Sequence, residues 1–357
     1  MAQPHDETDR YHRQRILPGF GAVAQERLRA SHAVVVGCGA LGCAAIDLLA
    51  RAGVGTLTLV DRDTVELTNL QRQSLFTEED ARTHAPKAEA ARRRVAAVNS
   101  QVRVHACVEH LCAENARELV RGAQVIVDGL DNYRTRYLLN ELAVREGIAY
   151  IHAGAVATRG TGMPVLAGVA AAAGIAREDA PCLRCLFPEI PPPGAGETCD
   201  TAGVFGPAVT IVGARAAGEA LKVLIGDLDA VDRSLWAYDA WTGRATRTPL
   251  AGAARADCEC CGRRRFELLD AADEDECAVL CGRNAVQVRP TVAARVDLEA
   301  LARKLRVHGE FAVRDGVLAG AVPGGFELSV FADGRVIVRG TVEPDVARGV
   351  YDRFVGR

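Results

Sequence analysis

The feature that most constrains the fold is a glycine-rich turn between a strand and a helix. The stretch VVVGCGALG (34–42) carries Gly37, Gly39 and Gly42 in a G-x-G-x-x-G pattern. A helix-periodic segment with a glycine stop follows (43–53), and TLTLVDRD (56–63) reads as the next strand. In this strand–helix–strand context, glycines permit close backbone approach and the helix start offers free N–H groups to a phosphate. The pattern predicts a nucleotide site.

An acid closes the second strand of this unit. Asp61 lies 19 residues after Gly42, where a carboxylate can accept hydrogen bonds from ribose hydroxyls. The glycines and this acid suit NAD as well as other phosphate compounds. They predict a nucleotide without choosing which one.

Further runs continue the alternation of strands and helices. Strands are expected at VRVHACV (102–108), QVIVDGLDN (124–132) and AYIHAGAV (149–156), with helices at ENARELVRGA (114–123) and RTRYLLNELAVREG (134–147). This order predicts an α/β fold with a doubly wound, mostly parallel, Rossmann-like sheet. Ligands of such sheets gather at the carboxyl ends of the strands, where Gly37, Asp61 and 128–132 are expected.

Polar and basic residues beyond the ribose acid favour a triphosphate. Asn69, Arg72, Gln73 and Lys87 follow Asp61 in the sequence. A nicotinamide dehydrogenase needs an apolar pocket there, whereas a triphosphate brings about four negative charges that cations or magnesium must offset. Asp131, at a strand end, is a candidate magnesium ligand. ATP with Mg²⁺ is therefore expected rather than NAD.

Together these motifs resemble a known family. RYHRQ (10–14), VVVGCGALG (34–42), LVDRDTVELTNLQRQ (59–73), APK (85–87) and DGLDN (128–132) are similar to the motifs of MoeB/ThiF-type adenylyltransferases. That family belongs to the ubiquitin-activating-enzyme superfamily. The resemblance runs from about residue 10 to residue 262, with the motifs in the expected order.

The resemblance implies roles for individual residues. Asp61 would bind the ribose, while Asn69, Arg72 and Lys87 would contact the ATP phosphates and Asp131 would take magnesium. Arg13 would reach into the partner subunit's site in a homodimer and neutralise phosphate charge from across the interface.

Two C-x-x-C pairs predict a structural zinc site. Cys182 and Cys185 form CLRC, and Cys258 and Cys261 form CECC. Four thiolates from two such pairs suit a tetrahedral Zn²⁺ with no open position, which disfavours a catalytic role for the metal. Cys260 could replace Cys258 or Cys261 as a ligand. The C-x-x-C spacing usual for zinc sites favours Cys258 and Cys261.

A Pro/Gly-rich segment lies between the pairs, and the resemblance implies that it crosses over the active site (about 186–203). Cys199 near its end is a candidate nucleophile, because a loop thiol near a cationic site can have a depressed pKa. The resemblance places the family's catalytic cysteine in this loop. It would accept the acyl group as a thioester or take part in a sulfur relay, unless an external sulfur donor bypasses it. Adenylation itself does not require this thiol.

The region after Phe266 is expected to form a second domain, giving boundaries at 1–266 and 267–357. Two predicted hairpins turn at Asp315–Gly316 and Asp333–Gly334, and helices are predicted over DLEALARKL (297–305) and PDVARGVYDRFV (344–355). These elements predict a small α+β domain. It is too short for the rhodanese domain that some family members carry, and both carrier docking and extension of the dimer stay open.

Composition excludes several classes of function. The formal net charge of -3 gives no reason to expect nucleic acid or a membrane surface. No apolar run reaches the roughly 18 residues of a membrane span, and the first residues lack the apolar core of a secretory signal. A cytoplasmic protein is expected.

The expected function is ATP-dependent adenylation of the C-terminal glycine carboxylate of a small ubiquitin-like sulfur-carrier protein ending in Gly-Gly. The carboxylate would attack the α-phosphate while Arg13, Arg72, Lys87 and magnesium on Asp131 stabilise the developing charge. One alternative is an adenylating relative that acts on a small molecule or a tRNA base. A more distant one is an NAD-dependent dehydrogenase.

Overall fold

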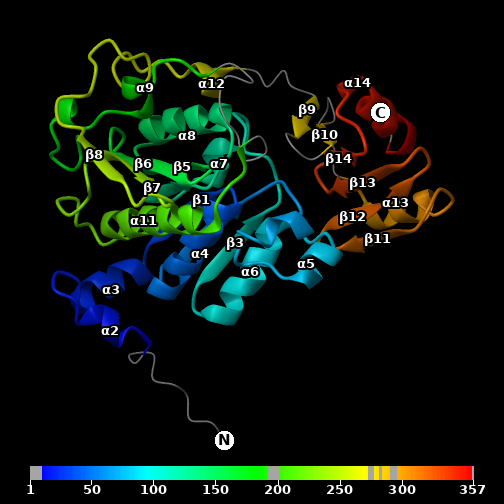
Figure 1. Cartoon of the computed structure of the whole chain (residues 1–357), viewed down its shortest axis with the longest axis horizontal. Helices are drawn as coiled ribbons and strands as arrows, with labels where there is room; N and C mark the ends of the chain where they lie inside the picture. Colours follow the sequence, from blue (N-terminus) through cyan, green and yellow to red (C-terminus); the bar gives the residue numbers. More distant parts are fainter. Residues whose placement is uncertain (1–9, 192–201, 272–276, 281–283, 290–295, 356–357) are drawn as a thin grey trace, which may run out of the picture. The chain divides into compact units, whose positions relative to one another are not determined.

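The structure is a computed structural model that describes residues 10–191, 202–271, 277–280, 284–289 and 296–355 (Figure 1). The chain divides into two compact units. The first comprises the described residues up to 62, then 67–77, then those from 87 to 271. The second comprises 63–66, 78–86 and the described residues from 277 onwards. Two short segments of the N-terminal half therefore belong to the C-terminal unit.

The first unit is built on an eight-stranded sheet with the order β3-β2-β1-β4-β5-β6-β7-β8 among the described residues. Neighbouring strands from β3 to β5 pair in parallel, and β5 to β8 pair antiparallel. The strands are β1 (His32–Val36), β2 (Thr56–Val60), β3 (Arg103–Cys107), β4 (Val125–Asp128), β5 (Ala149–Val156), β6 (Arg159–Val165), β7 (Ser234–Asp239) and β8 (Ala245–Pro249).

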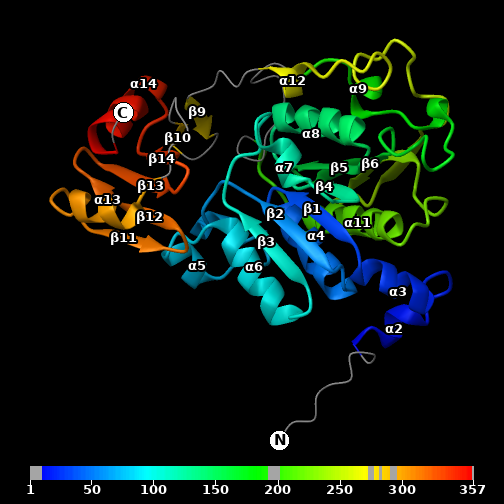
Figure 2. The ribbon, with the colours of Figure 1, turned by 180° about the vertical axis from the view of Figure 1, so that it is seen from behind.

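Helices cover both faces of this sheet, as Figures 1 and 2 show from opposite sides. One face carries α4 (Ala40–Ala52), α6 (Lys87–Val98) and α11 (Gly206–Leu224), and the other carries α7 (Ala116–Leu119) and α8 (Tyr133–Glu146). The remaining described helices of the unit are α2 (His12–Arg15), α3 (Gly21–Arg29), η1 (Leu67–Asn69), η2 (Arg177–Asp179), α9 (Leu183–Leu186) and α12 (Glu267–Asp270). The doubly wound, mostly parallel fold expected from the sequence is confirmed.

Close packing of α4 against α11 fixes the helix that follows the glycine turn. A Cβ on Gly213 of α11 would lie 2.6 Å from the Leu41 carbonyl oxygen and 2.8 Å from the Ala44 Cβ. Only glycine lets the two backbones approach so closely. Apolar residues cover most of α4, because the sheet and α11 bury it on two sides. No described helix is both long and apolar enough to cross a membrane.

The helix predicted over 114–123 is shorter than expected. Regular helix covers only Ala116–Leu119. Asn115 Oδ1 accepts a hydrogen bond of 2.9 Å from the Cys112 N–H and holds the preceding residues in a turn. Gly122, with φ 77°, ends the segment in the left-handed conformation. The turn closed by the Asn115 side chain and the left-handed Gly122 therefore leave room for only a short helix between them.

The second unit contains a six-stranded antiparallel sheet with the order β11-β12-β13-β14-β10-β9 among the described residues. Its elements are α5 (Glu78–Arg82), β9 (Cys277–Leu280), β10 (Ala285–Val288), α13 (Leu298–Leu305), β11 (Phe311–Arg314), β12 (Val317–Val322), β13 (Phe326–Phe331), β14 (Val336–Arg339) and α14 (Pro344–Phe354). The side chains of α13 and α14 pack with alternate residues of the strands into one apolar core.

The predicted hairpin turns of this unit are present. Asp315 and Gly316 both have positive φ, 47° and 78°, as a two-residue turn between β11 and β12 requires. Gly334, with φ 84°, lies in the turn from β13 to β14. Turn chemistry is local, so the sequence located both hairpins.

Candidate active site

Three glycines shape a turn at the carboxyl ends of β1 and β4. Gly37 has φ 91°, and a Cβ there would lie 2.6 Å from the carbonyl carbon and oxygen of Gly129. A Cβ on Gly42 would lie 1.9 Å from the Gly37 carbonyl oxygen. A Cβ on Gly129 would lie 2.1 Å from the same oxygen. The loops after β1 and β4 thus cross at a distance that only glycine allows. The sequence had not identified Gly129 as part of this arrangement.

The start of α4 faces the same edge of the sheet. Gly39 is its N-cap residue, in an extended conformation and without a side-chain cap. The N–H groups of the first turn of a helix lack intrahelical partners and attract anions. This end of α4 is therefore suited to a phosphate group.

Asp61 ties the end of β2 to the glycine turn. Its Oδ2 accepts a hydrogen bond of 2.7 Å from the Cys38 N–H, and the residue is buried. The carboxylate lies at the strand end next to the phosphate-binding turn, as expected for a ribose-binding acid. The structure brings Asp61 together with Gly37 and Gly39.

Lys87 is brought to the same turn from the start of α6. Burial raises the pKa of Cys43 to about 12, and the Lys87 ammonium acts in the opposite direction on the thiols of both Cys43 and Cys38. The ammonium therefore lies close to the glycine turn although Lys87 is only 2% exposed. A buried cation at a predicted phosphate site is suited to a phosphate oxygen.

The segment between Asp61 and Lys87 supplies further polar groups. Asn69 and Gln73 are buried, and the Gln73 Oε1 has no hydrogen-bond partner among the described residues. Arg72 is half-buried and its guanidinium donates to the Thr68 carbonyl at 2.9 Å. The Asn69 carbonyl accepts from the N–H groups of Arg72 and Gln73, which closes a compact turn. A buried amide oxygen without a protein partner can accept a hydrogen bond from a bound ligand.

Asp131 lies in the loop after β4 and is exposed. Asp128 Oδ1 accepts from the Leu130 N–H at 2.9 Å, and the Arg136 guanidinium donates to the Leu130 carbonyl at 2.5 Å. Asn132 caps α8 by accepting from the Thr135 N–H. The loop is therefore held on both sides of Asp131, and the Asp131 carboxylate is left at the surface.

A buried polar network supports that loop from below. Asp128 Oδ2 accepts from the Tyr150 hydroxyl at 2.7 Å, lies 2.9 Å from His152 Nδ1 and lies 3.2 Å from Arg136 Nε. Burial raises the pKa of Asp128, but Arg136 and the hydrogen bond of His152 outweigh it, so the pKa is lowered overall. Sequence reasoning missed this network. Its only signal is a pair of polar residues at positions i and i+2 of an apolar strand.

Arg13 and Cys199 are the remaining predicted site residues. Arg13 is exposed on α2, which packs against α3, and its predicted contact lies with a partner subunit. Cys199 lies outside the described residues. The chain just after it is anchored, because the Ala157 N–H donates to the Gly203 carbonyl at 2.9 Å and the Phe205 N–H donates to the Ala157 carbonyl at 2.8 Å.

The four predicted zinc ligands form one cluster. The Sγ atoms of Cys182, Cys185, Cys258 and Cys261 all lie within 4.8 Å of one another. Cys182 and Cys258 are 3.6 Å apart, and Cys185 and Cys261 are 3.4 Å apart. Tetrahedral Zn²⁺ at about 2.3 Å from each sulfur separates neighbouring sulfurs by about 3.8 Å. The cluster fits such an ion.

Surrounding groups hold the cluster in shape. Asn140 of α8 accepts from the Leu183 N–H at 2.7 Å and donates to the Cys260 Sγ at 3.3 Å, so one side chain connects the two segments that carry the cysteine pairs. The hydrogen bond with Cys182 lowers the pKa of Cys185, which favours the thiolate that binds metal. Cys260 is not part of the cluster of four sulfurs and is fully buried beside Asn140.

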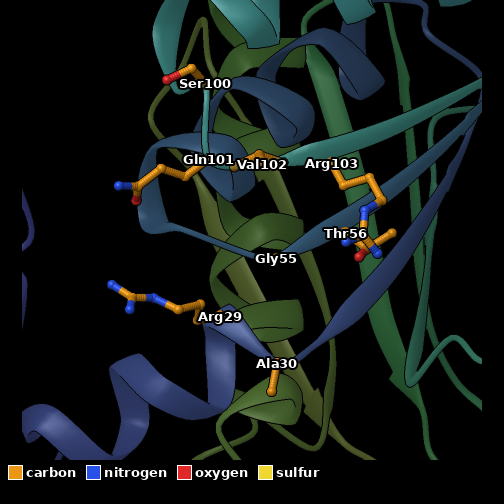
Figure 3. A pocket seen from close by; sticks show the side chains of 8 residues that line it. All are labelled: Arg29, Ala30, Gly55, Thr56, Ser100, Gln101, Val102 and Arg103. Atoms are coloured by element: carbon orange, nitrogen blue, oxygen red, sulfur yellow. The ribbon is translucent and has the colours of Figure 1, made fainter. Parts of the chain in front are cut away.

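A shallow cavity of about 470 Å³ lies at the other edge of the sheet (Figure 3). Its lining includes Thr56 and Arg103, which begin β2 and β3, and Arg29, which ends α3. These are the amino ends of the strands. Ligands of parallel sheets bind at the carboxyl ends, so the glycine turn and not this cavity is the candidate site.

Comparisons with known proteins found one family and several similar proteins. The ThiF family matches residues 11–260. A Bacillus subtilis (strain 168) protein named sulfur carrier protein ThiS adenylyltransferase is 38% identical over 349 residues, which are 98% of this chain and 100% of the relative. A Thermus thermophilus protein named sulfur carrier protein adenylyltransferase is 44% identical over 246 residues, which are 67% of this chain and 86% of the relative.

Among solved structures, E. coli MccB with MccA-N7isoASN is similar, with a TM-score of 0.60 and 21% identity over 72% of this chain and 75% of that chain. This likeness supports the fold. The family match spans the glycine turn and three of the four clustered cysteines, all but Cys261, and the first relative is aligned over nearly the whole chain. The chain belongs to the ThiF family.

Proposed function

We propose that this chain is an adenylyltransferase that activates the C-terminal glycine carboxylate of a small ubiquitin-like sulfur-carrier protein. The observation that carries the proposal is the convergence of Asp61, the buried Lys87 ammonium and the start of α4 on one glycine turn. Relatives of 38% and 44% identity bear names of this activity.

In the proposed reaction, a carboxylate oxygen of the carrier attacks the α-phosphorus of ATP. The bond from that phosphorus to the bridging oxygen breaks, so pyrophosphate leaves and an acyl-adenylate remains. A carboxylate is already deprotonated at neutral pH, so the enzyme needs no general base. Its task is to position the two reactants and to stabilise negative charge.

The proposed roles follow the chemistry of each side chain. Asp61 binds the ribose hydroxyls, and the N–H groups at the start of α4 bind a phosphate. Asn69, Arg72, Gln73 and Lys87 bind the remaining phosphate oxygens. Lys87 and Arg72 keep the triphosphate in place as charge moves to the leaving pyrophosphate.

Magnesium is proposed to bind at Asp131. An exposed carboxylate on a loop held at both ends fits a hard cation that retains several water ligands. When bound, Mg²⁺ offsets phosphate charge. The residues around Asp128 hold the Asp131 loop in place for this contact.

Zinc is proposed to bind Cys182, Cys185, Cys258 and Cys261 in a structural site. Four thiolates complete a tetrahedral shell, so the metal has no open position for a substrate. The site joins the segment after β6 to the segment after β8 and so stabilises the fold. Loss of metal would therefore reduce stability rather than the chemical step.

We also propose roles for Arg13 and Cys199. Arg13 would act from a partner subunit of a homodimer, since its exposed guanidinium lies on a surface helix. Cys199 would accept the activated acyl group as a thioester or join a sulfur relay, with an external sulfur donor as the other route.

The test is ATP–pyrophosphate exchange with a panel of carriers that end in Gly-Gly. Exchange that depends on one carrier and is unaffected by NAD supports the proposal. Exchange that requires a small molecule or a tRNA instead would assign the chain to a different adenylating activity. Absence of exchange with every carrier would contradict the proposal.

A further inference from the structure

Two segments that flank the candidate phosphate-binding residues belong to the C-terminal unit. Residues 63–66 begin two positions after Asp61, and 78–86 end directly before Lys87. The part between them, 67–77, contains Asn69, Arg72 and Gln73 and belongs to the first unit. The C-terminal unit therefore holds the chain at both ends of the nucleotide-binding segment.

The two ends of this segment are joined to each other. Thr64 and Pro86 form an isolated antiparallel bridge, and the Val65 N–H donates to the Ala85 carbonyl at 2.8 Å. Thr64 and Val65 are fully buried. We call the residues 64–66 and 84–86 the neck. The backbone joins the neck directly to Lys87 on one side and, through residues 62 and 63, to Asp61 on the other.

Arg339 fastens the neck to the C-terminal sheet. From the end of β14, its guanidinium donates to Thr64 Oγ1 at 2.7 Å and lies 3.6 Å from the Glu66 carboxylate. Its other terminal nitrogen donates to Ser329 Oγ on β13 at 3.0 Å. The Arg339 side chain is 15% exposed. One partly buried guanidinium thus links two strands to two residues of the neck.

Arg339 lies apart from the apolar core of its own unit. Val336 and Val338 of β14 belong to the core packed by α13 and α14, whereas Arg339 does not. Alternate residues of a strand point to opposite faces, so Arg339 and Val338 project to different sides. Removing the guanidinium therefore leaves the core of the unit intact.

We propose that Arg339 is a positioning residue for the ATP site, and that it acts through Thr64 and the neck on Lys87 and on the segment 67–77. This inference rests on the proposed function, because it assigns Lys87 to the phosphates. Arg339 itself touches neither substrate nor reacting atoms. A shift of about 1 Å in a positioned catalytic group can cost up to about 100-fold in rate, so a fastening of this kind matters for activity.

The test compares Arg339→Ala, Arg339→Lys, Thr64→Val and the Arg339→Ala/Thr64→Val double variant in the full chain. Thr64→Val removes only the hydroxyl and keeps the shape of the side chain. Arg314→Ala is the matched control, since Arg314 is an exposed arginine of the same sheet, on β11. Direct ATP binding, the KM for ATP and kcat in pyrophosphate exchange, and the Tm are measured for each protein.

We expect Arg339→Ala to weaken ATP binding and raise the KM for ATP about 10-fold, with Thr64→Val somewhat milder. The double variant should be no worse than Arg339→Ala, because both changes break the same link. Arg339→Lys should recover part of the loss by restoring one donor to Thr64. Arg314→Ala should bind ATP like the wild type.

Three results overturn the inference. If the wild type binds ATP and Thr64→Val and both Arg339 variants bind it equally well, this inference is overturned and the proposed function still stands. A fall in Tm with no change in the KM for ATP would reduce Arg339 to a structural role. A wild type that does not bind ATP at all would overturn both proposals.

Discussion

The Asp61 carboxylate accepts a hydrogen bond of 2.7 Å from the backbone N–H of Cys38. The end of β2 is thereby fastened to the middle of the glycine turn after β1. A ligand that contacts both would find a ribose acceptor and a phosphate-binding turn in fixed relation to each other. The predictions below test the site that this relation organises.

Replacing Asp61 should weaken ATP binding. Asp61→Ala removes the ribose acceptors and the anchor of the glycine turn, and hydrogen bonds to a charged group contribute about 1.5–3 kcal/mol. We expect about a 10- to 100-fold rise in the Kd for ATP by calorimetric titration. Asp61→Asn should lose less, since its amide oxygen can still accept from Cys38. Asp47→Asn, at a half-buried position of α4 where the carboxylate pairs with Arg51, is the control, and an equal loss there would contradict the assignment.

Gly42→Ala should disable the nucleotide site. Its Cβ would fall 1.9 Å from the Gly37 carbonyl oxygen, so the glycine turn must shift. Gly218→Ala is a matched control on α11, because a Cβ there meets nothing within 4 Å. Alanine should stabilise that helix by about 0.5–1 kcal/mol. Measurements of ATP binding and of thermal unfolding compare the two variants. Normal ATP binding by Gly42→Ala would show that the turn does not hold the phosphates.

The elements of this site that the sequence identified depend on neighbours along the chain. The glycine pattern, the acid after β2 and the hairpin glycines each act over a few residues, so spacing alone located them. Asn140 connects the two cysteine pairs, and Arg339 bonds to Thr64 from 275 residues away. Such contacts follow from tertiary packing, and nothing in the local pattern of Asn140 or Arg339 indicates them.

Lys87→Met should reduce adenylation more than binding of the carrier. The substitution keeps the apolar stem and removes the cation that we assign to the phosphates. Removing one group that stabilises developing charge costs about 100- to 1000-fold in kcat. Arg92→Met, on the same helix and exposed, is the control. Exchange kinetics at saturating ATP give the comparison, and a wild-type kcat for Lys87→Met would refute the role.

Zinc content should distinguish Cys258 from Cys260. The wild type is expected to hold about one Zn²⁺ per chain, and Cys258→Ser should lose it because a ligand is removed. Cys260→Ser should retain the metal, since its sulfur lies outside the cluster of four. Elemental analysis of the purified proteins provides the measurement. If Cys260→Ser lost zinc and Cys258→Ser retained it, Cys260 and not Cys258 would be the zinc ligand.

Arg136→Met should destabilise the fold in a pH-dependent manner. In the wild type the pKa of Asp128 is lowered overall, so its stabilising contribution is present above the usual carboxyl pKa and is lost as the pH falls through the lowered one. Without Arg136 the buried carboxylate lacks its main cation, and we expect a loss of about 3–5 kcal/mol at neutral pH. Burial then dominates and raises the pKa of Asp128. The loss of stability relative to the wild type should therefore become smaller as the pH falls.

Urea unfolding between pH 7 and pH 5 measures this effect. Arg134→Met, an exposed arginine on the same helix, should show little change at either pH. A deficit in Arg136→Met that stays constant over this range would show that Asp128 is not the group responsible.

The most direct measurement of the central claim is the intact mass of a Gly-Gly carrier incubated with this protein, ATP and Mg²⁺. We predict a carrier species heavier by one adenylyl group (AMP less one water), together with release of pyrophosphate. The species should be absent when the carrier lacks its last two glycines, and strongly reduced with Lys87→Met. Pyrophosphate release without any adenylated carrier, across a panel of Gly-Gly carriers, would contradict the account.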